Sequence, residues 1–217
     1  MDISQGLNWI REHKVIAILR GIGEEHIFGV AQALMEGGIR AMEITWNTPG
    51  AENMIRGISE QFGDRMFIGA GTILDVQEFK KAALAGARFF VSPHLDETVI
   101  RLAVNRNLPA FPGAMTPQEV ARAFQCGATA VKVFPGTLDH IKRLREIFPH
   151  IPLIGLGGVN PDNVGQYLSA GCFAVGVGSS ILNKREIQAG NYRWIREQSA
   201  RLTESIAAFL HGQNRLH

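Results

Sequence analysis

The sequence predicts an α/β fold, a single-domain (β/α)8 TIM barrel spanning residues 1–217, with an additional helix at its N-terminus. Short apolar runs that end in Pro, Gly or Ser alternate with helical patterns about eight times, without a long insertion or linker. These runs are apolar on both faces, as expected of parallel strands covered by helices. The alternative is an open doubly wound sheet, but Arg20-Gly21-Ile22-Gly23 matches the glycine-rich fingerprint after its first strand poorly.

The predicted elements follow one another in a regular order along the chain. A short amphipathic helix at residues 4–12 comes first. The strands are expected at residues 14–19, 40–45, 66–70, 88–91, 108–111, 129–135, 153–156 and 173–177. The helices that follow them are expected at residues 24–35, 51–62, 75–84, 96–105, 117–126, 139–148, 161–169 and 192–210.

Local signals mark several helix ends. Thr116 and Glu119 have the spacing of a capping box at the start of a helix, and Gly127 ends that helix. Asn160 is expected to cap the helix at residues 161–169, which carries a proline in its first turn. These signals support a chain that alternates strand and helix to its end.

Composition and charge exclude several classes of protein. The formal net charge of +2 is too small to favour nucleic acid or an anionic membrane as the main partner. No apolar run approaches the roughly twenty residues that a membrane span requires. The polar start at residues 1–4 is unlike a signal peptide, so we expect a cytoplasmic protein. Cys126 and Cys172 lack the spacing of metal ligands or of a disulfide framework, and we expect buried thiols.

Lys132 is out of place in the apolar strand at residues 129–135. Removing an ammonium group from water is costly, so a buried lysine must reach a partner or lose its proton. The alternative is a lysine that extends along its strand until its charge reaches solvent.

Side-chain alternation predicts that Lys132, Glu43 and Arg20 converge inside the barrel. Apolar residues on either side of Lys132 and of Glu43 would face the helices, which directs both polar side chains inward. Arg20 follows an outward-facing Leu19 and also points inward. Strand ends form the mouth of a barrel, and Thr45, Asn47, Thr72, Ser92 and His94 lie near such ends as well. The alternative is an internal ion-pair network, which desolvation makes a weak stabiliser.

Glycines after the last two strands predict an anion site. Gly157-Gly158 precedes the helix capped by Asn160, and Gly178-Ser179 precedes a short helical turn. Free backbone N–H groups at such positions bind anions, and barrels often bind phosphate after strands seven and eight. Each pair is also compatible with a simple tight turn.

Several sequence blocks, in order and at the right spacing, resemble the 2-keto-3-deoxy-6-phosphogluconate (KDPG) aldolase family. This family includes the phosphogalactonate and the 4-hydroxy-2-oxoglutarate (KHG) aldolases. The resemblance covers roughly residues 7–182 and is carried jointly by the blocks rather than by any one of them. The blocks are Val15–Gly21, Glu43-Ile44-Thr45, Gly69-Ala70-Gly71-Thr72, Ser92-Pro93-His94, Pro112-Gly113, Lys132-Val133-Phe134-Pro135 and Gly157-Gly158-Val159.

The resemblance implies a homotrimeric (β/α)8 barrel that forms a Schiff base with pyruvate and needs no metal or other cofactor. The substrate would be KDPG or its galactonate epimer, cleaved to pyruvate and glyceraldehyde 3-phosphate, with KHG as a further substrate. On the matching positions, the resemblance implies that Lys132 is the Schiff-base lysine and that Glu43 is the general acid/base. Arg20 and Thr72 would bind the pyruvate carboxylate, and Pro93 and Phe134 would form the pocket wall. The substrate phosphate would be bound by Gly157, Gly158, Gly178 and Ser179.

The chain departs from the family pattern near the distal end of the substrate. Asn47 stands where many members have arginine, Leu156 precedes the glycine pair where threonine is common, and the loop at residues 136–139 is short. These departures leave the identity of the sugar open. A non-covalent phosphosugar epimerase or isomerase and a non-catalytic phosphosugar-binding barrel are the alternative functions. We interpret His13 and His94 as incidental, and the basic run at residues 142–145 as a solvated helix face.

Overall fold

Nine short parallel strands form one sheet in the computed structural model, which describes residues 2–213. Their order in the sheet is β5-β4-β3-β2-β1-β9-β8-β7-β6. The strands are β1 (Val15–Leu19), β2 (Ala41–Thr45), β3 (Phe67–Gly71), β4 (Phe90–Val91), β5 (Ala110–Phe111), β6 (Gly113–Ala114), β7 (Val131–Val133), β8 (Leu153–Leu156) and β9 (Ala174–Val177).

The two edges of this sheet belong to one continuous segment, so the sheet closes into a barrel. Only Pro112 separates β5 from β6. Proline has no N–H to donate to a strand ladder, which accounts for the interruption. Its carbonyl still accepts a hydrogen bond from the backbone N of Lys132 at 2.9 Å. The nine strands are therefore eight barrel strands, which confirms the predicted (β/α)8 barrel; the open-sheet alternative is wrong.

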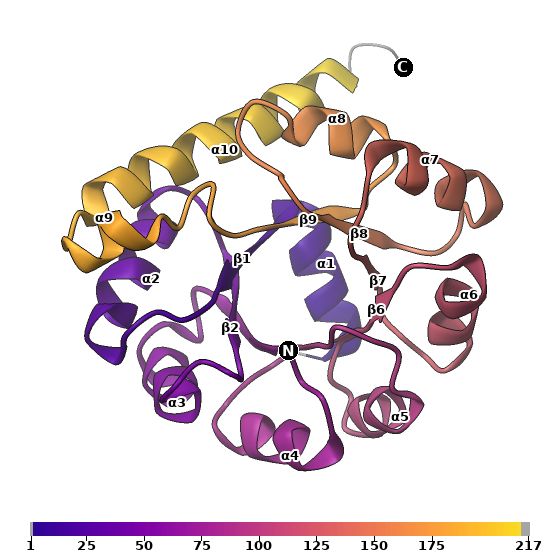
Figure 1. Ribbon diagram of the computed structural model, residues 1–217, viewed down its shortest axis with the longest axis horizontal. Helices are drawn as coiled ribbons and strands as arrows, with labels where there is room; N and C mark the ends of the chain where they lie inside the picture. Colours follow the sequence, from indigo (N-terminus) through magenta and orange to yellow (C-terminus); the bar gives the residue numbers. More distant parts are fainter. Residues whose placement is uncertain (1, 214–217) are drawn as a thin grey trace.

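The helices after the first surround the ring of strands, as Figure 1 shows. In chain order, the helices are α1 (Ile3–His13), α2 (Ile27–Glu36), α3 (Ala51–Phe62), α4 (Val76–Leu84), α5 (Glu97–Asn105), α6 (Pro117–Gln125), α7 (Leu138–Ile147), α8 (Val164–Ser169), α9 (Lys184–Gln188) and α10 (Tyr192–Gln213). The capping box of Thr116 and Glu119 is present at the start of α6, as predicted.

Three elements differ from the sequence-based expectation. A 3-10 turn, Glu24–His26, precedes α2 where a continuous helix was expected. The helix expected at residues 161–169 starts only at Val164. Residues 161–163 form a turn, in which the Asn160 side chain accepts the N–H groups of Asp162 and Asn163 as a helix cap would. The short helix α9 was not expected.

Helix α1 closes one end of the barrel. In Figure 1 it lies across the centre of the ring of strands. Ile10 is fully buried in the apolar cluster that fills the barrel, and the indole of Trp9 donates to the carbonyl of Arg40 at 2.8 Å. The N-terminal ends of the strands are therefore covered, and the mouth lies at their carboxyl ends.

Two apolar clusters confirm the predicted alternation of side chains. The cluster between strands and helices includes the residues that flank Lys132 and Glu43, namely Val131, Val133, Met42 and Ile44. The cluster inside the barrel contains Ile16, Ala41, Phe67, Phe89, Phe111, Ala130 and Ile154. Because these two sets alternate along each strand, Lys132 and Glu43 are directed into the barrel.

Both cysteines are free and buried, as expected. Within residues 2–213, no helix combines the length and apolar character needed to cross a membrane. The same residues contain no group of three or more His, Cys, Asp or Glu side chains placed to hold a metal ion.

Candidate active site

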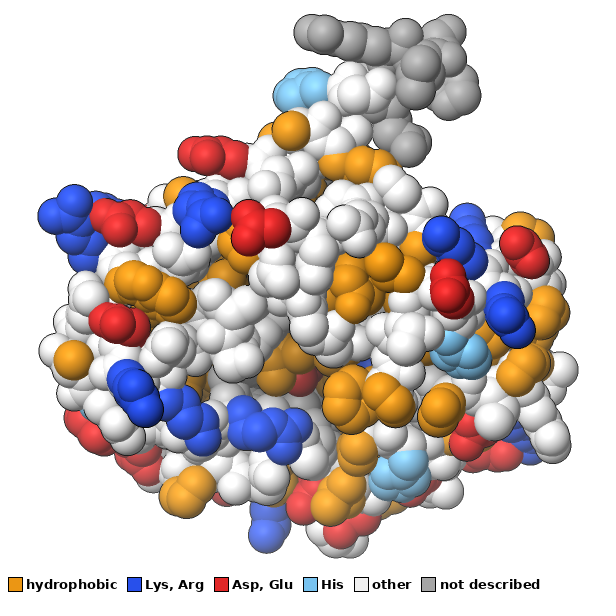
Figure 2. Space-filling model, turned by 45° about the horizontal axis from the view of Figure 1, so that its top comes forward, with side chains coloured by type: hydrophobic (Ala, Val, Ile, Leu, Met, Phe, Trp, Pro, Cys, Tyr) orange, Lys and Arg blue, Asp and Glu red, His pale blue; other side chains and the backbone are white. Residues whose placement is uncertain are grey.

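A cavity of about 770 Å³ occupies the mouth of the barrel. The surface in Figure 2 is hollowed near its middle, with Lys and Arg side chains along one edge of the hollow. All ten residues predicted to form the site line this cavity. They are Arg20, Glu43, Thr72, Pro93, Lys132, Phe134, Gly157, Gly158, Gly178 and Ser179.

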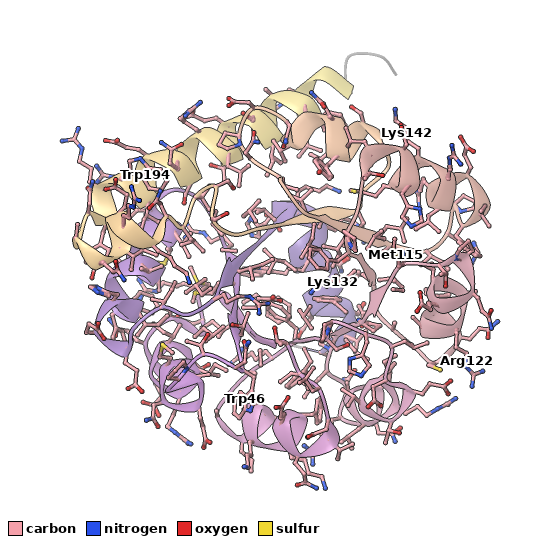
Figure 3. All side chains as sticks on the ribbon, in the orientation of Figure 1. Trp46, Met115, Arg122, Lys132, Lys142 and Trp194 are labelled. Atoms are coloured by element: carbon pink, nitrogen blue, oxygen red, sulfur yellow. The ribbon has the colours of Figure 1, made fainter. Side chains whose placement is uncertain are left out.

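Lys132 extends from the middle of β7 toward the centre of the barrel, whereas Lys142 lies on the outer helix α7 (Figure 3). Only 7% of Lys132 is exposed to solvent. Its Nζ lies over the ring of Phe134, 5.5 Å from the ring centroid. Phe134 itself is 51% exposed and forms part of the rim of the mouth. The lysine therefore remains inside the barrel, as predicted, and the alternative in which it extends along its strand to solvent is wrong.

Burial shifts the pKa of both Lys132 and Glu43 toward the neutral form. The pKa of Lys132 is lowered, mainly by burial, with the Glu43 carboxylate opposing the shift and Arg20 adding to it. Glu43 is 3% exposed, and burial raises its pKa against the attraction of Lys132 and Arg20. No ion pair within 4.0 Å joins the two among the residues described here. The site thus combines an amine that loses its proton more easily with a carboxyl group that holds one more easily.

Arg20 and Thr72 meet at the ends of β1 and β3. The guanidinium of Arg20 donates to Thr72 Oγ1 at 3.1 Å. Thr72 has a φ of 57°, a left-handed conformation that is uncommon for a β-branched residue and is often found at functional sites. The N–H of Gly21 donates to Thr48 Oγ1 at 3.0 Å, which fixes the chain directly after Arg20. Arg20 is exposed, so it can present further N–H donors to an anion in the cavity.

The glycine pair after β8 presents its backbone to the cavity. Gly157 and Gly158 have φ values of 107° and 71°, and a Cβ on either would meet no atom within 4 Å. Left-handed backbone, not crowding, accounts for glycine at these positions. Tyr167 donates to the carbonyl of Gly157 at 2.6 Å, and Asn163 donates to that of Gly158 at 2.9 Å. Both carbonyls thus have hydrogen-bond donors within the protein.

The loop after β9 is joined to the glycine turn. The hydroxyl of Ser180 donates to the carbonyl of Val159 at 2.7 Å, so the two glycine-containing turns lie against one another at the mouth. Gly178 and Ser179 line the cavity beside them. The four residues predicted for the anion site therefore line the mouth, but the helix expected directly after Gly158 starts only at Val164.

Several residues at the mouth were not predicted, and some expected neighbours lie elsewhere. Lys184, Ser180, Ile18 and Leu182 also line the cavity. Lys184 comes from the unexpected helix α9, where strand alternation provides no signal. Asn47 and His94 lie near strand ends but do not line the cavity, and His13 lies at the C-terminus of α1, at the closed end of the barrel.

Comparisons with known proteins agree with the predicted resemblance. A sequence profile described as "Aldolase: KDPG and KHG aldolase" matches residues 7–198. The chain is 35% identical over 179 residues to the 2-dehydro-3-deoxy-6-phosphogalactonate aldolase of Escherichia coli strain K12, which covers 81% of this chain and 87% of that protein. A solved structure described as native KDPGal matches with a TM-score of 0.86 at 31% identity, covering 91% of this chain and 96% of the other.

A second solved structure contains a trapped intermediate. It is the KDPG aldolase of Legionella pneumophila, with pyruvate captured at low pH as a covalent carbinolamine. It matches with a TM-score of 0.82 at 29% identity, covering 88% of this chain and 94% of the other. The sequence profile and the first relative each account for most of the chain. The protein therefore belongs to the KDPG and KHG aldolase family.

Proposed function

We propose that the protein is a class I aldolase that cleaves a 2-keto-3-deoxy-6-phospho sugar acid, of the gluconate or galactonate series, into pyruvate and glyceraldehyde 3-phosphate. One observation carries the proposal: Lys132, the lysine at the bottom of the mouth, has a pKa lowered by burial and shares the cavity with the buried acid Glu43. Membership of an aldolase family supports the same reaction.

Lys132 is the nucleophile of this proposal. An amine must be neutral to attack a ketone, and in water its pKa of about 10.4 leaves almost none of it neutral near pH 7. The apolar interior of the barrel favours the neutral form. The nitrogen attacks C2 of the 2-keto acid to give a carbinolamine. Glu43, protonated at this stage because burial raises its pKa, gives its proton to the departing hydroxyl, so that water leaves and an iminium ion and the Glu43 carboxylate remain.

Glu43 is the proton carrier. The iminium withdraws electrons, so the C3–C4 bond breaks when the C4 hydroxyl loses its proton to the Glu43 carboxylate. The electron pair of that bond forms an enamine, and the aldehyde leaves. Glu43 then returns the proton to C3, which regenerates an iminium ion. Hydrolysis of that iminium releases pyruvate and neutral Lys132, and the Glu43 carboxylate takes up the proton that is set free. One carboxyl group can serve both steps because the two proton transfers occur in sequence.

The remaining predicted residues hold the two ends of the substrate. Arg20 and Thr72, already joined by a hydrogen bond, would bind the carboxylate next to the reacting carbonyl. The turns at Gly157-Gly158 and Gly178-Ser179 would bind the phosphate through backbone N–H groups. Pro93 and Phe134 would form the wall between these ends.

A homotrimer and a cytoplasmic location remain predictions, as does activity without a metal or other cofactor. Exposed apolar side chains support self-association. Met115 in the loop before α6 is 50% exposed, Phe124 in α6 is 37% exposed and Ile147 in α7 is 55% exposed. Light scattering after gel filtration gives the mass directly. Cell fractionation tests the location, and assay after chelator treatment tests the metal independence.

Borohydride reduction in the presence of pyruvate tests the covalent mechanism. We expect an irreversible loss of activity and a pyruvate-derived mass on the peptide that contains Lys132. The matched control is Lys132→Met, which should acquire no label. A label on another residue would overturn the assignment of Lys132 as the nucleophile. No label at all would overturn the covalent mechanism and favour the non-covalent epimerase, because that enzyme needs no imine. Retro-aldol rates on the gluconate and galactonate epimers and on KHG then rank the substrates.

A further inference from the structure

We propose that Lys184 is a substrate-binding residue that confers preference for phosphorylated over unphosphorylated substrates. This inference rests on the proposed aldolase function and adds a residue to its site. Lys184 lines the same cavity as Lys132 and Glu43, but it comes from α9, outside the strands and glycine turns that form the rest of the mouth.

The backbone around Lys184 is held by its own hydrogen bonds. The side chain of Asn183 accepts the N–H of Arg185 at 2.9 Å and so caps the start of α9. Ile187, on the same short helix, is buried in the outer apolar cluster. The Lys184 side chain therefore extends from an anchored position, five residues after Ser179, and needs no rearrangement of the loop to reach the cavity.

The ammonium group reaches the end of β1, the strand that pairs with β9. A Cβ atom on Gly21 would lie 3.3 Å from the Nζ of Lys184. Gly21 directly follows Arg20, so the lysine bridges the loop after β9 and the loop after β1. Glycine at this position leaves the ammonium group free to lie against the backbone of the β1 loop.

The charge of Lys184 has no counterion within the described part of the chain. No carboxylate among the described residues lies within 4.0 Å of the ammonium group of Lys184. The charged residues that line the cavity are Arg20, Glu43, Lys132 and Lys184. Lys132 must be neutral to react, and Arg20 is bonded to Thr72, where the substrate carboxylate is proposed to bind. Lys184, five residues after Ser179, is then the remaining cation of the cavity.

A phosphate group requires such a cation. A phosphate monoester carries about −1.5 to −2 charges at neutral pH. The backbone dipoles at a turn or helix start provide only about half a positive charge. The glycine turns can therefore orient a phosphate group, but they leave most of its charge uncompensated. A lysine on the same cavity supplies the missing charge as a mobile ammonium group.

Steady-state kinetics of Lys184→Gln tests this proposal. We expect KM for the phosphorylated substrate to rise by about 10- to 100-fold, the range of a hydrogen bond to a charged group, with kcat changed by less than about threefold. On the corresponding unphosphorylated 2-keto-3-deoxy sugar acid, kcat/KM should change by less than about threefold. Inorganic phosphate should inhibit the wild-type enzyme competitively and the variant more weakly. Lys184→Arg should restore most of the affinity.

Arg185→Gln is the matched control, because Arg185 is the next residue, is exposed and does not line the cavity. It should leave both substrates unaffected. The proposal is wrong if Lys184→Gln lowers kcat/KM equally for the two substrates. It is also wrong if the substitution changes kcat/KM for neither substrate, because Lys184 then has no role in phosphate selection. Borohydride trapping of pyruvate separates the two hypotheses: labelling of Lys132 with no phosphate selectivity overturns this inference alone, whereas absence of labelling in the wild type overturns the aldolase itself.

Discussion

Gly71 leaves the space that the carboxylate of Glu43 occupies. A Cβ atom on Gly71 would lie 2.6 Å from Oε1 and 2.7 Å from Cδ of Glu43. The two residues are on neighbouring strands, β3 and β2, and both are buried. Atoms that are not bonded to one another do not approach this closely, so a methyl group on residue 71 would force the carboxylate out of its present position. This glycine therefore serves the packing of the site and not a turn.

Replacing Gly71 with alanine should displace Glu43 and lower kcat by about 10- to 100-fold, since a shift of about 1 Å can have such an effect on a catalytic group. Borohydride trapping of pyruvate should continue, because Lys132 is unchanged. The control is Gly165→Ala in α8, where a Cβ would meet no atom within 4 Å. That variant should retain full activity. Unchanged kcat in Gly71→Ala would show that the position of Glu43 is not critical.

Replacing Glu43 with glutamine should lower kcat by about 10²- to 10⁴-fold, the usual contribution of a general acid/base. The exchange of the pyruvate methyl protons with D₂O, followed by NMR, should fall to a similar extent, because the same carboxyl group is proposed to protonate C3. Equal loss in both assays is the expected result. If the exchange rate stays at the wild-type value while cleavage is lost, another residue protonates the enamine.

Lys132 should destabilise the folded protein at neutral pH. Its folded pKa is lowered below the unfolded value of 10.5, so between these two values the unfolded chain binds more protons and the stability rises with pH. Each unit of lowering corresponds to about 1.4 kcal/mol. Lys132→Met, made in a Glu43→Gln background to remove the carboxylate, should therefore raise the free energy of unfolding at pH 7. The gain should shrink toward pH 10.5.

Urea titrations at pH 7 and pH 10 measure this effect. The reference protein is the Glu43→Gln single variant at each pH. Equal destabilisation by Lys132→Met at both pH values would mean that packing of the lysine stem outweighs the burial of its charge.

The two cysteines should be unreactive in the folded protein. Burial raises the pKa of Cys172 to about 12, and it also raises the pKa of Cys126. At pH 8 only about one Cys172 side chain in ten thousand would be a thiolate, the reactive form. A colorimetric thiol reagent should detect no rapid reaction in the native protein and two thiols in denaturant. Rapid native modification of either residue would contradict this.

Most of the barrel can be predicted from local sequence patterns, because a strand buried on both faces and an amphipathic helix each have a characteristic periodicity. The same alternation places Lys132 and Glu43 inside, since side chains on a strand point to opposite faces. The helix boundaries are less accurate. Asn160 makes the hydrogen bonds of a helix cap with Asp162 and Asn163, yet residues 161–163 form a turn and α8 starts only at Val164.

The sequence by itself determined the fold class, the inward phase of the reactive residues and the glycine turns, because all of these follow from neighbours along the chain. Tertiary structure alone decided which distant residues share the cavity and how closely they approach. The closure of the sheet at Pro112, the space beside Gly71 for Glu43 and the reach of Lys184 over Gly21 are contacts between segments far apart in sequence. No local periodicity encodes such contacts, because they depend on how the whole barrel closes.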